Sequence, residues 1–371
     1  MLSDEERERY SRHLILDEIG VSGQQTLKES AVLCVGTGGL GSPVLLYLAA
    51  AGVGRLGVVD FDNVEESNLQ RQVIHGTSTV GQSKVKSATE RLRDLNPNIH
   101  VDCYEEALTR ENALDIFQHF DVIVDGTDNF PTRYLVNDAC VLLDKPFVYG
   151  SIFKFEGQCS VFNYRGGPNY RDLYPEPPPP GLVPSCAEGG VLGILPGVIG
   201  TLQATEAIKV LLGLGETLSG RLLTYNALTM KFREFVLKSD PHAQPITGLI
   251  DYHGFCGVQD ADPSAHKARE IGARELRDKL KTTDVHLIDV REANEWAEGH
   301  IQGAVLIPLG ELERRMGELP QSGHIVAYCK LGGRSKKACE ILAKNGFEDL
   351  FTLSGGILAY REEFERDPHA S

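Results

Sequence analysis

A short stretch near the C-terminal end of the sequence, "YCKLGGRS" (328–335), contains a cysteine whose neighbours favour reactivity. It joins an expected strand (324–329) to an expected helix (335–345), so Cys329 is predicted to begin a turn at a helix N-terminus. The turn comprises Lys330, Leu331, Gly332, Gly333, Arg334 and Ser335. Its backbone N–H groups can point at the sulfur, and both the helix N-terminus and Arg334 favour an anion. The sequence therefore predicts a stabilised, nucleophilic thiolate at Cys329.

A glycine-rich stretch near the N-terminal end indicates a second kind of chemistry. The pattern G-x-G-x-x-G joins an expected strand (31–36) to an expected helix (42–52), and its glycines are Gly36, Gly38, Gly39 and Gly41. Glycines there let backbone N–H groups approach a phosphate at the helix N-terminus. Asp60 ends the next expected strand, where a carboxylate can accept hydrogen bonds from ribose hydroxyls. These features alone suit a nicotinamide-dependent oxidoreductase as well as other nucleotide enzymes.

The residues that follow Asp60 favour a triphosphate over a dinucleotide. The stretch "DFDNVEESNLQRQ" supplies Asn68 and Arg71, and Lys84 opens a later helix. Asp128 lies further on, in "DGTDNF". Two cations can neutralise phosphates, and a carboxylate oxygen is a ligand that Mg²⁺ prefers. An oxidoreductase would need a hydride-acceptor site instead, so we expect an ATP site with magnesium.

Composition and charge exclude several classes of protein. The chain has 371 residues, 42% of them hydrophobic, and a formal net charge of -15 without a lysine or arginine block. A nucleic-acid-binding protein would need a concentrated basic face, so we expect no nucleic-acid partner. The charged start "MLSDEERERY" is unlike a signal peptide, and polar residues interrupt the most apolar region, 191–215, so we expect no membrane span. Eight cysteines without a C-x-x-C pair suit a reduced, cytoplasmic protein.

Strands and helices alternate along the chain, which indicates an α/β architecture. A buried strand (31–36), the helix after it and a second strand (56–60) begin a doubly wound, Rossmann-like sheet. Further helices are expected at 82–95, 131–144, 189–213, 273–280 and 335–345, and further strands at 121–128, 285–290, 324–329 and 349–353. The polar, proline-bearing stretch 246–270 is typical of a linker. We therefore expect one domain over 1–245 and a smaller α/β domain over 271–371.

With these residues the chain from "RYSRHL" (9–14) to about Gly257 resembles the E1-like adenylyltransferase family. The likeness is to bacterial enzymes that activate sulfur carrier proteins for molybdopterin and thiamine synthesis. The resemblance implies an ATP site formed by Gly36, Gly38, Gly39, Gly41, Asp60, Ser67, Asn68, Leu69, Gln70, Arg71, Lys84, Asp128 and Asn129. Asp60 would bind ribose, and Asp128 would bind Mg²⁺. The phosphates would be contacted by Asn68, Arg71 and Lys84. Arg12 matches an arginine that reaches into the partner subunit's site, which implies a homodimer.

The same resemblance implies the substrate and the reaction. The substrate would be the C-terminal glycine carboxylate of a small ubiquitin-like carrier protein that ends in Gly-Gly. This carboxylate would attack the α-phosphate of ATP, release pyrophosphate and form an electrophilic acyl adenylate. Cys186, in "LVPSCAEGG", matches the family's crossover-loop cysteine, which implies attack on an acyl or persulfidic intermediate. Judged from the residues alone, a lone cysteine such as Cys186 is more often structural.

The chain departs from the family at one point. Many relatives bind a structural zinc through two C-x-x-C pairs, the first just after a Gly-Gly-Pro. Here "GGPNYRDLYP" has Asn169 and Asp172 where the first pair would stand, and "DYHGFCG" keeps only Cys256. Four soft ligands cannot be assembled from these residues, so we expect no zinc and a loop held by packing.

The C-terminal part, about 271–366, resembles rhodanese, a sulfurtransferase fold. The resemblance rests on "YCKLGGRS" together with "LIDVREANEWAEGHIQGAVLIPL" and "LSGGILAY". Arsenate reductases and some tyrosine phosphatases share the fold but typically have one more residue between cysteine and arginine. Only four residues separate Cys329 from Arg334, so the loop suits a sulfane sulfur better than a phosphate. We expect Asp289 and Arg291 to brace this domain.

Together the two resemblances predict one reaction. Cys329 would carry a persulfide, received from a donor such as a cysteine desulfurase or thiosulfate, whose terminal sulfur attacks the acyl adenylate. Cys186 or an external thiol would then free the carrier thiocarboxylate. The alternatives are an activator that passes the carrier to protein conjugation, a nicotinamide-dependent oxidoreductase and a non-catalytic interaction protein. The sequence leaves the pathway open among molybdopterin, thiamine, cysteine and tRNA thiolation.

Overall fold

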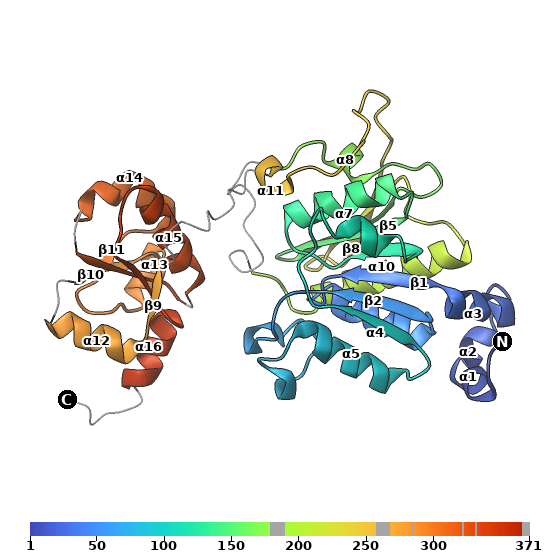
Figure 1. Cartoon of the computed structure of the whole chain (residues 1–371), viewed down its shortest axis with the longest axis horizontal. Coiled ribbons are helices and arrows are strands. Elements are labelled where there is room, and N and C mark those ends of the chain that lie inside the picture. The colour runs from blue at the N-terminus through green and yellow to red at the C-terminus, as the bar shows by residue number, and fades with distance from the viewer. Residues whose placement is uncertain (179–189, 257–267, 283–284, 321–322, 331, 366–371) are drawn as a thin grey trace. The chain divides into compact units, whose positions relative to one another are not determined.

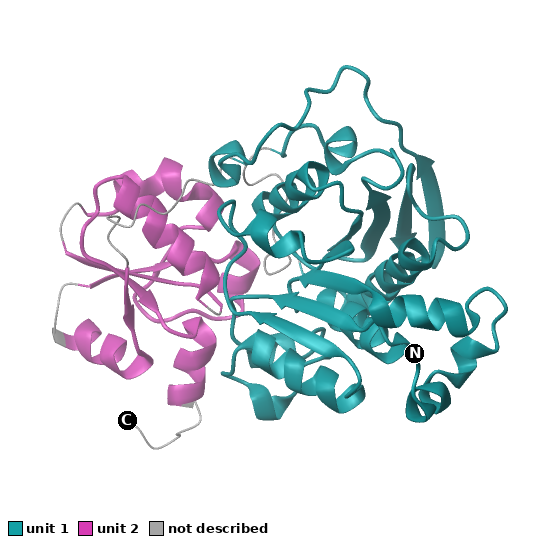
Figure 2. Ribbon diagram, turned by 45° about the vertical axis from the view of Figure 1, so that its right-hand side comes forward, with its two compact units in different colours: residues 1–260 teal, residues 261–371 magenta. Residues whose placement is uncertain are grey.

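The computed structural model describes residues 1–178, 190–256, 268–282, 285–320, 323–330 and 332–365 (Figure 1). The chain divides into two compact units, Met1–Asp260 and Ala261–Ser371 (Figure 2). Each unit has its own sheet and its own hydrophobic clusters. The predicted fold class, a Rossmann-like α/β domain followed by a smaller α/β domain, is confirmed.

The first unit is built on an eight-stranded sheet with the order β3-β2-β1-β4-β5-β6-β7-β8. The strands are β1 (Ala31–Val35), β2 (Arg55–Val59), β3 (His100–Tyr104), β4 (Val122–Asp125), β5 (Phe147–Phe153), β6 (Glu156–Phe162), β7 (Arg221–Asn226) and β8 (Lys231–Val236). The first five strands in this order, from β3 through β2, β1 and β4 to β5, are parallel to their neighbours. The remaining pairs, β5 with β6, β6 with β7 and β7 with β8, are antiparallel. The sequence patterns do not predict the antiparallel part. Its last strand, β8, is exposed along its whole length and so lacks the apolar run of a buried strand.

The register of the central strands brings the candidate site residues to one edge of this sheet. Val35, the last residue of β1, lies opposite Val59 of β2 and Asp125 of β4. The glycine motif, Asp60 and the stretch that carries Asp128 therefore all leave the sheet at its carboxyl edge. Ligands bind at this edge in open α/β sheets.

Helices cover both faces of the first sheet. One face is covered by α3 (Gly20–Glu29), α4 (Gly41–Ala51), α5 (Lys84–Leu95) and α10 (Leu195–Leu212), and the other by α6 (Ala113–Phe117) and α7 (Phe130–Leu142). Figure 1 shows β1 and β2 between α4 and α5 below and α7 above. Side chains alternate along β1, because Val32 and Cys34 join the first cluster whereas Leu33 and Val35 join the second.

The helix α10 begins later than predicted. It starts at Leu195 rather than near residue 189, because Leu192 donates from its backbone N–H to the carbonyl oxygen of Lys154 at 2.9 Å. The buried Gln203 of α10 donates to the carbonyl oxygen of Asp125 at 2.7 Å, and Glu206 is buried as well. Among the residues that the structure describes, no helix is long and apolar enough to span a membrane.

Short elements complete the first unit. They are α1 (Asp4–Arg9), α2 (Ser11–Leu14), η1 (Glu66–Asn68), η2 (Thr77–Thr79), α8 (Tyr170–Leu173) and α11 (Tyr252–Phe255). α11 lies within the stretch expected to be a linker, and Tyr252 donates to Asp138 of α7 at 2.8 Å. The residues up to α11 are therefore packed on the first unit.

The second unit contains a five-stranded, all-parallel sheet with the order β11-β10-β12-β13-β9. The strands are β9 (Arg269–Ile271), β10 (Val285–Asp289), β11 (Val305–Leu306), β12 (His324–Tyr328) and β13 (Leu350–Leu353). The helices are α12 (Ala273–Thr282), α13 (Ala293–Ala297), η3 (Leu309–Glu311), α14 (Leu312–Arg315), η4 (Met316–Glu318), α15 (Gly333–Lys344) and α16 (Gly356–Glu365). Leu342 of α15 packs on one face of the sheet, and Leu276 of α12 and Ile357 of α16 pack on the other. Cys329 follows the central strand β12.

Candidate active sites

The glycine motif forms a tight loop between β1 and α4. A Cβ on Gly41 would lie 2.0 Å from the carbonyl oxygen of Gly36, so only glycine fits where the helix begins. Within the described part of the chain, the backbone N–H groups of Gly38, Gly39 and Leu40 donate no hydrogen bond. These groups can therefore donate to an anion at the N-terminus of α4, a helix of 11 residues.

Asp60 follows β2 and holds the glycine loop. Its Oδ2 accepts from the backbone N–H and from the hydroxyl of Thr37, both at 2.8 Å, and its Oδ1 accepts from the backbone N–H of Asp62 at 3.0 Å. The carboxylate is thereby fixed beside the loop and keeps further lone pairs for a ligand. Thr37 occupies a variable position of the glycine pattern, so the motif gave no signal for it.

The residues around η1 lie beside the same loop. Asn68 is buried, and Arg71 is partly exposed and donates from Nη1 to the carbonyl oxygen of Ser67 at 3.1 Å. The Cγ of Arg71 lies 3.7 Å from the point where a Cβ on Gly39 would stand. The structure therefore brings the Arg71 side chain to the glycine loop, as an ATP site requires. Leu69, between them, is partly buried.

Two glutamines line this region in different ways. Gln70 packs against Gly193, and a side chain at position 193 would overlap with Gln70. Gln72 is buried, and its Nε2 lies 3.7 Å from the position of a Cβ on Gly38. The Oε1 of Gln72 has no hydrogen-bond partner among the described residues. A buried oxygen without a partner is uncommon, and a bound ligand could complete it. The sequence analysis assigned no role to Gln72.

Lys84 is buried at the start of α5 and is paired with a carboxylate that the sequence analysis did not single out. Its Nζ donates to Oδ2 of Asp62 at 2.8 Å, and its backbone N–H donates to the carbonyl oxygen of Asp62 at 3.0 Å. The ammonium group has two further N–H donors for a phosphate. The sequence does contain a sign that Asp62 belongs to the site. It lies two residues after Asp60, so both carboxylates are on one loop.

Asp128 is exposed in the turn between β4 and α7. The buried Asp125 holds this turn in place. It accepts from the backbone N–H of Thr127 at 2.8 Å and from Nε of Arg133 at 2.8 Å. Asn129 caps α7, since its side-chain oxygen accepts from the backbone N–H of Thr132 at 2.9 Å. One exposed carboxylate suits Mg²⁺ that is also bound by substrate phosphates.

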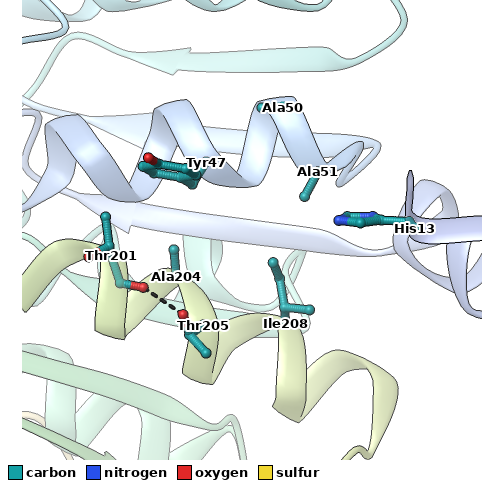
Figure 3. Close-up of a pocket in the computed structure, with 8 residues that line it drawn as sticks. All are labelled: His13, Tyr47, Ala50, Ala51, Thr201, Ala204, Thr205 and Ile208. Atoms are coloured by element: carbon teal, nitrogen blue, oxygen red, sulfur yellow. Dashed lines mark hydrogen bonds between the residues drawn. The ribbon is translucent and has the colours of Figure 1, made fainter. Parts of the chain in front are cut away.

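Arg12 is exposed on α2, and no hydrogen bond or ion pair joins it to another described residue. Its neighbour His13 donates from Nδ1 to Oε1 of Gln24 at 2.9 Å and faces a groove of about 480 Å³ between α4 and α10. The groove is also lined by Tyr47, Ala50, Ala51, Thr201, Ala204, Thr205 and Ile208 (Figure 3). Apart from Ile208 and the exposed Tyr47, these side chains are alanines and threonines, so this surface is open and mainly apolar.

In the second unit, Cys329 is 2% exposed and lies where β12 ends. The backbone N–H of Gly332 donates to its Sγ at 3.1 Å. Gly332 has a φ of 111°, in the left-handed region, and this conformation turns its N–H back toward the sulfur. α15 begins at the next residue, so a helix N-terminus follows directly. Leu331 lies outside the described residues.

The loop around Cys329 is held from two sides. The hydroxyl of Ser335 donates to the carbonyl oxygen of Gly332 at 2.9 Å and shares a hydrogen bond with the Thr352 hydroxyl at 2.7 Å. At the start of α16, the backbone N–H of Ile357 donates to the carbonyl oxygen of Cys329 at 2.9 Å. The segment 352–357, which contains the "LSGG" stretch, therefore supports the cysteine loop.

Arg334, in the first turn of α15, is paired with Glu295 of α13. Its two terminal nitrogens donate to the two carboxylate oxygens at 2.6 and 2.7 Å. The hydrogen bond from Arg334 lowers the pKa of Glu295 to about 2. Glu295 in turn raises the pKa of Arg334, and the charge of Cys329 contributes in the same direction. The guanidinium is thus near the sulfur but is largely neutralised by Glu295, which the sequence analysis did not single out.

Asp289 and Arg291 form a buried pair at the end of β10. The Nε of Arg291 donates to both carboxylate oxygens of Asp289, at 2.9 and 3.0 Å, and its Nη2 donates at 2.6 Å. The same Nη2 donates to the carbonyl oxygen of Gly299 at 2.9 Å. Asp289 lies opposite Tyr328, the residue before Cys329. These contacts connect the pair to the backbone rather than to a ligand, so they suit a bracing role.

Most of the other described cysteines are buried. Burial raises the pKa of five thiols: Cys34, Cys140, Cys159, Cys256 and Cys339. For Cys339, in α15, the pKa rises to about 12. Little thiolate forms on such a group at neutral pH, so it is a poor nucleophile. Cys103 is exposed, and all seven described cysteines are free. Cys186 lies outside the described residues.

The loop region without cysteine pairs is held by an ion pair and aromatic rings. Arg171 donates from Nε and Nη2 to the two oxygens of Asp138 at 2.8 and 2.7 Å. Its guanidinium lies 4.7 Å from the ring centre of Phe255, and Asn169 caps α8. Among the described residues, no cluster of three or more His, Cys, Asp or Glu side chains could hold a metal ion.

The fold and the two candidate sites define a two-unit α/β protein, with a glycine loop whose backbone N–H groups are unused by the described residues in one unit and a cysteine loop in the other. Comparison with known families makes the assignment specific. Residues 10–246 match the ThiF family, and residues 272–363 match the rhodanese-like domain. The chain belongs to the ThiF family and carries a rhodanese-like domain. Both resemblances inferred from the sequence are thereby confirmed.

Individual relatives agree with this assignment. The chain is 54% identical to the probable adenylyltransferase/sulfurtransferase MoeZ of Mycobacterium tuberculosis, with 99% of this chain and 95% of the relative covered. It is 53% identical to the sulfur carrier protein adenylyltransferase of Thermus thermophilus, with 69% of this chain and 98% of the relative covered. It is 45% identical to the adenylyltransferase and sulfurtransferase MOCS3 of Anopheles gambiae, with 92% and 82% covered. Among solved structures, E. coli MccB has a similar fold, with a TM-score of 0.58, 22% identity and coverage of 67% of this chain and 74% of that chain.

Proposed function

We propose that this protein adenylates the C-terminal glycine of a ubiquitin-like sulfur carrier protein and then transfers a persulfide sulfur from Cys329 to it. The observation that carries the proposal is the pairing, in one chain, of a glycine loop with unused N–H groups and a cysteine loop with an N–H directed at its sulfur. The relatives that match both parts are named adenylyltransferase and sulfurtransferase. The Thermus thermophilus relative, which matches the first part, is named for a sulfur carrier protein.

In the first step ATP is a substrate. The free N–H groups of the glycine loop, with Arg71 and Lys84, stabilise the phosphates, and Asp60 accepts hydrogen bonds from ribose. A carboxylate oxygen of the carrier attacks the α-phosphorus, the bond to the bridging oxygen breaks, and pyrophosphate leaves. The carrier is then a mixed anhydride, in which AMP is a good leaving group. Asp128 would hold Mg²⁺, which supplies positive charge to the phosphates.

In the second step Cys329 supplies the nucleophile. Its persulfide is an anion that the loop N–H groups and the N-terminus of α15 stabilise. The terminal sulfur attacks the carbonyl carbon of the adenylate, the carbon–oxygen bond breaks, and AMP leaves with that electron pair. The carrier is now joined to Cys329 through an acyl disulfide.

A thiol must complete the reaction. Attack of a thiolate on Sγ of Cys329 breaks the sulfur–sulfur bond, releases the carrier thiocarboxylate and leaves a mixed disulfide on Cys329. We propose Cys186 as this thiol, because it matches the crossover-loop cysteine of the family. A second thiol then reduces the disulfide. In a single turnover without added reductant, release of the carrier thiocarboxylate by the Cys186→Ala variant at the wild-type rate would contradict this role.

The partners follow from this chemistry. The first is a carrier with a C-terminal Gly-Gly, and the second is a sulfur donor such as a cysteine desulfurase or thiosulfate. We propose the cytoplasm as the location, because the reaction needs reduced thiols. We propose an adenylation domain over 1–245 and a sulfurtransferase domain over 271–371, joined by a linker over 246–270 whose helix α11 packs on the first domain.

We also propose a homodimer in which Arg12 completes the partner's ATP site. The exposed, unpaired Arg12 and the open apolar groove beside His13 support this arrangement. A mixture of Arg12→Ala and Asp128→Ala subunits tests it. Mixed dimers would contain one intact site, so about a quarter of the wild-type activity should return after subunit exchange. If Arg12 acts within its own chain, the mixture stays inactive.

The central experiment is a sulfur-transfer assay with the purified full chain. A ubiquitin-like carrier is incubated with Mg-ATP and a persulfide donor, and its intact mass is measured. We expect the mass increase of one oxygen replaced by sulfur, and only when both ATP and donor are present. Modification without ATP, or hydrolysis of ATP without any dependence on the carrier, would contradict the proposed function.

A further inference from the structure

A buried histidine lies between the two parts of the nucleotide site. His75 follows the stretch that contains Arg71, lies between η1 and η2, and is 8% exposed. None of the roles described so far uses it. A buried imidazole needs hydrogen-bond partners for both ring nitrogens, so its partners show what it connects.

Both ring nitrogens of His75 have partners, and they belong to different elements. Nε2 lies 3.1 Å from the carbonyl oxygen of Thr37 in the glycine loop. Nδ1 lies 2.9 Å from the hydroxyl oxygen of Ser87 in α5. A carbonyl oxygen can only accept, so Nε2 carries the hydrogen and donates to Thr37. In the neutral ring, Nδ1 is an acceptor that faces the Ser87 hydroxyl, which also contacts Oγ1 of Thr79 at 2.9 Å.

The charges around His75 favour this neutral form. Burial is the main cause that lowers the pKa of His75, and the positive charge of Lys84 acts in the same direction. The Thr37 carbonyl and the charge of Asp60 act in the opposite direction but are smaller effects in sum. The imidazole therefore serves as one donor and one acceptor at neutral pH.

The two partners of His75 each carry a group of the site. Thr37 donates from its N–H and hydroxyl to Asp60, which is placed for ribose. Ser87 lies on α5 three residues after Lys84, which is placed for phosphate. One side chain thus ties the loop of the ribose carboxylate to the helix of the phosphate cation.

We propose that His75 is a positioning residue of the ATP site, which sets the spacing between the glycine loop with Asp60 and the helix with Lys84. The inference rests on the proposed function, because it assumes that ATP is the ligand. His75 itself contacts no substrate in this role. Its loss should weaken ATP binding and leave the later chemistry largely unaffected.

A matched pair of substitutions separates the two contacts. The amide nitrogen of a glutamine can take the place of Nε2, so His75→Gln keeps the donor to Thr37 and loses Ser87. The shorter amide of an asparagine takes the place of Nδ1, so His75→Asn keeps the contact to Ser87 and loses Thr37. We expect the Kd for Mg-ATP, measured by calorimetry, to rise about 10-fold for His75→Asn and about 3-fold for His75→Gln, because the loss of either contact breaks the link.

Kinetics provide the readout that a merely structural role would not produce. In carrier-dependent ATP–pyrophosphate exchange, His75→Asn should raise KM for ATP while kcat stays within about 3-fold. Wild-type values of Kd and KM in His75→Asn would overturn the inference. Equal losses of kcat in both variants, with unchanged KM, would overturn it as well, because they would indicate fewer folded molecules.

A milder variant covers the case in which both histidine variants fail to fold. Ser87→Ala keeps the bond to Thr37, and we expect it to raise the Kd for Mg-ATP about 3-fold; an unchanged Kd would then reject the role of His75. Measurements of Mg-ATP binding and of ATP–pyrophosphate exchange also distinguish a failure of this inference from a failure of the proposed function. If the wild-type protein binds Mg-ATP but shows no carrier-dependent exchange, the proposed function fails while the binding data still decide the role of His75.

Discussion

The glycine loop of the first unit and the cysteine loop of the second have the same place in their folds but opposite hydrogen bonding. Both follow a central parallel strand and lead into a helix N-terminus. In the glycine loop, the N–H groups of Gly38, Gly39 and Leu40 have no partner among the described residues. In the cysteine loop, the N–H of Gly332 already donates to the sulfur of Cys329.

This difference shows how one backbone arrangement supports two chemistries. A loop whose N–H groups are unused is prepared for an anion that arrives from solution, here the phosphates of ATP. A loop whose N–H is directed at its own cysteine is prepared for an anion that is part of the chain, here a thiolate or persulfide. In the proposed reaction, the first loop binds ATP, whereas the second carries the reacting sulfur.

Each of the two loops lies beside a buried aspartate–arginine pair of the same kind. β4, beside β1, ends in Asp125, which is paired with Arg133, and β10, beside β12, ends in Asp289, which is paired with Arg291. Each aspartate is fully buried and lies opposite the last residue of the strand that carries the loop. The pairs hold the strand ends without contacting the reacting groups.

Substitution of the reactive cysteine should have the largest effect. Cys329→Ala should reduce formation of carrier thiocarboxylate by roughly 10⁴-fold or more, because it removes the nucleophile. Carrier-dependent ATP–pyrophosphate exchange should remain, since the glycine loop is intact. Cys339→Ala is the matched control, because that buried thiol should not react, and it should retain sulfur transfer. Loss of exchange in Cys329→Ala would show that the two loops do not divide the reaction as proposed.

The reciprocal substitution affects the binding loop. Asp128→Ala should lower ATP–pyrophosphate exchange by about 100- to 1000-fold, because it removes the ligand proposed for Mg²⁺. Thiosulfate-to-cyanide sulfur transfer by the second unit should be unchanged in the same preparation. Exchange at the wild-type rate would reject the role of Asp128, and a parallel loss of both activities would indicate misfolding instead.

The buried pairs can be tested unit by unit, because Trp296 of α13 is the only tryptophan of the chain. Asp289→Ala leaves Arg291 charged and buried, so the free energy of unfolding of the second unit should fall by about 3–5 kcal/mol. Urea unfolding followed by Trp296 fluorescence measures this change. Asp125→Ala, the matched change in the first unit, should leave the Trp296 transition in place. A shared shift would show that the units do not unfold separately.

The pairing of Arg334 with Glu295 should have the smallest effect. The pKa of Glu295 is about 2 in the folded protein and ordinarily 4.5, so its contribution to stability is complete above about pH 4.5 and is lost as the pH falls toward 2. Glu295→Gln should therefore lower the free energy of unfolding by about 1–2 kcal/mol at pH 7, and the difference should shrink near pH 3. Trp296 fluorescence in urea at both pH values provides the measurement. A difference that does not depend on pH would point to packing rather than charge.

Both resemblances and the fold class followed from short local patterns. The glycine spacing, the "NLQR" stretch and "YCKLGGRS" each depend on residues close together in the chain, so their meaning does not require tertiary contacts. The caps of two helices came only from the structure, in which Ser83 caps α5 and Asn129 caps α7. Among the antiparallel strands, β8 was missed because it is exposed along its length and has no apolar run.

By itself the sequence determined which residue types stand at the strand ends and therefore which chemistry the chain can perform. Only the tertiary structure decided which groups hold those residues. Asp62 pairs with Lys84 across 22 positions, His75 reaches Thr37 across 38, and Glu295 reaches Arg334 across 39. Such partners meet because parallel strands align their ends at one edge of a sheet. That alignment depends on the register of the whole sheet, which no local pattern of residues encodes.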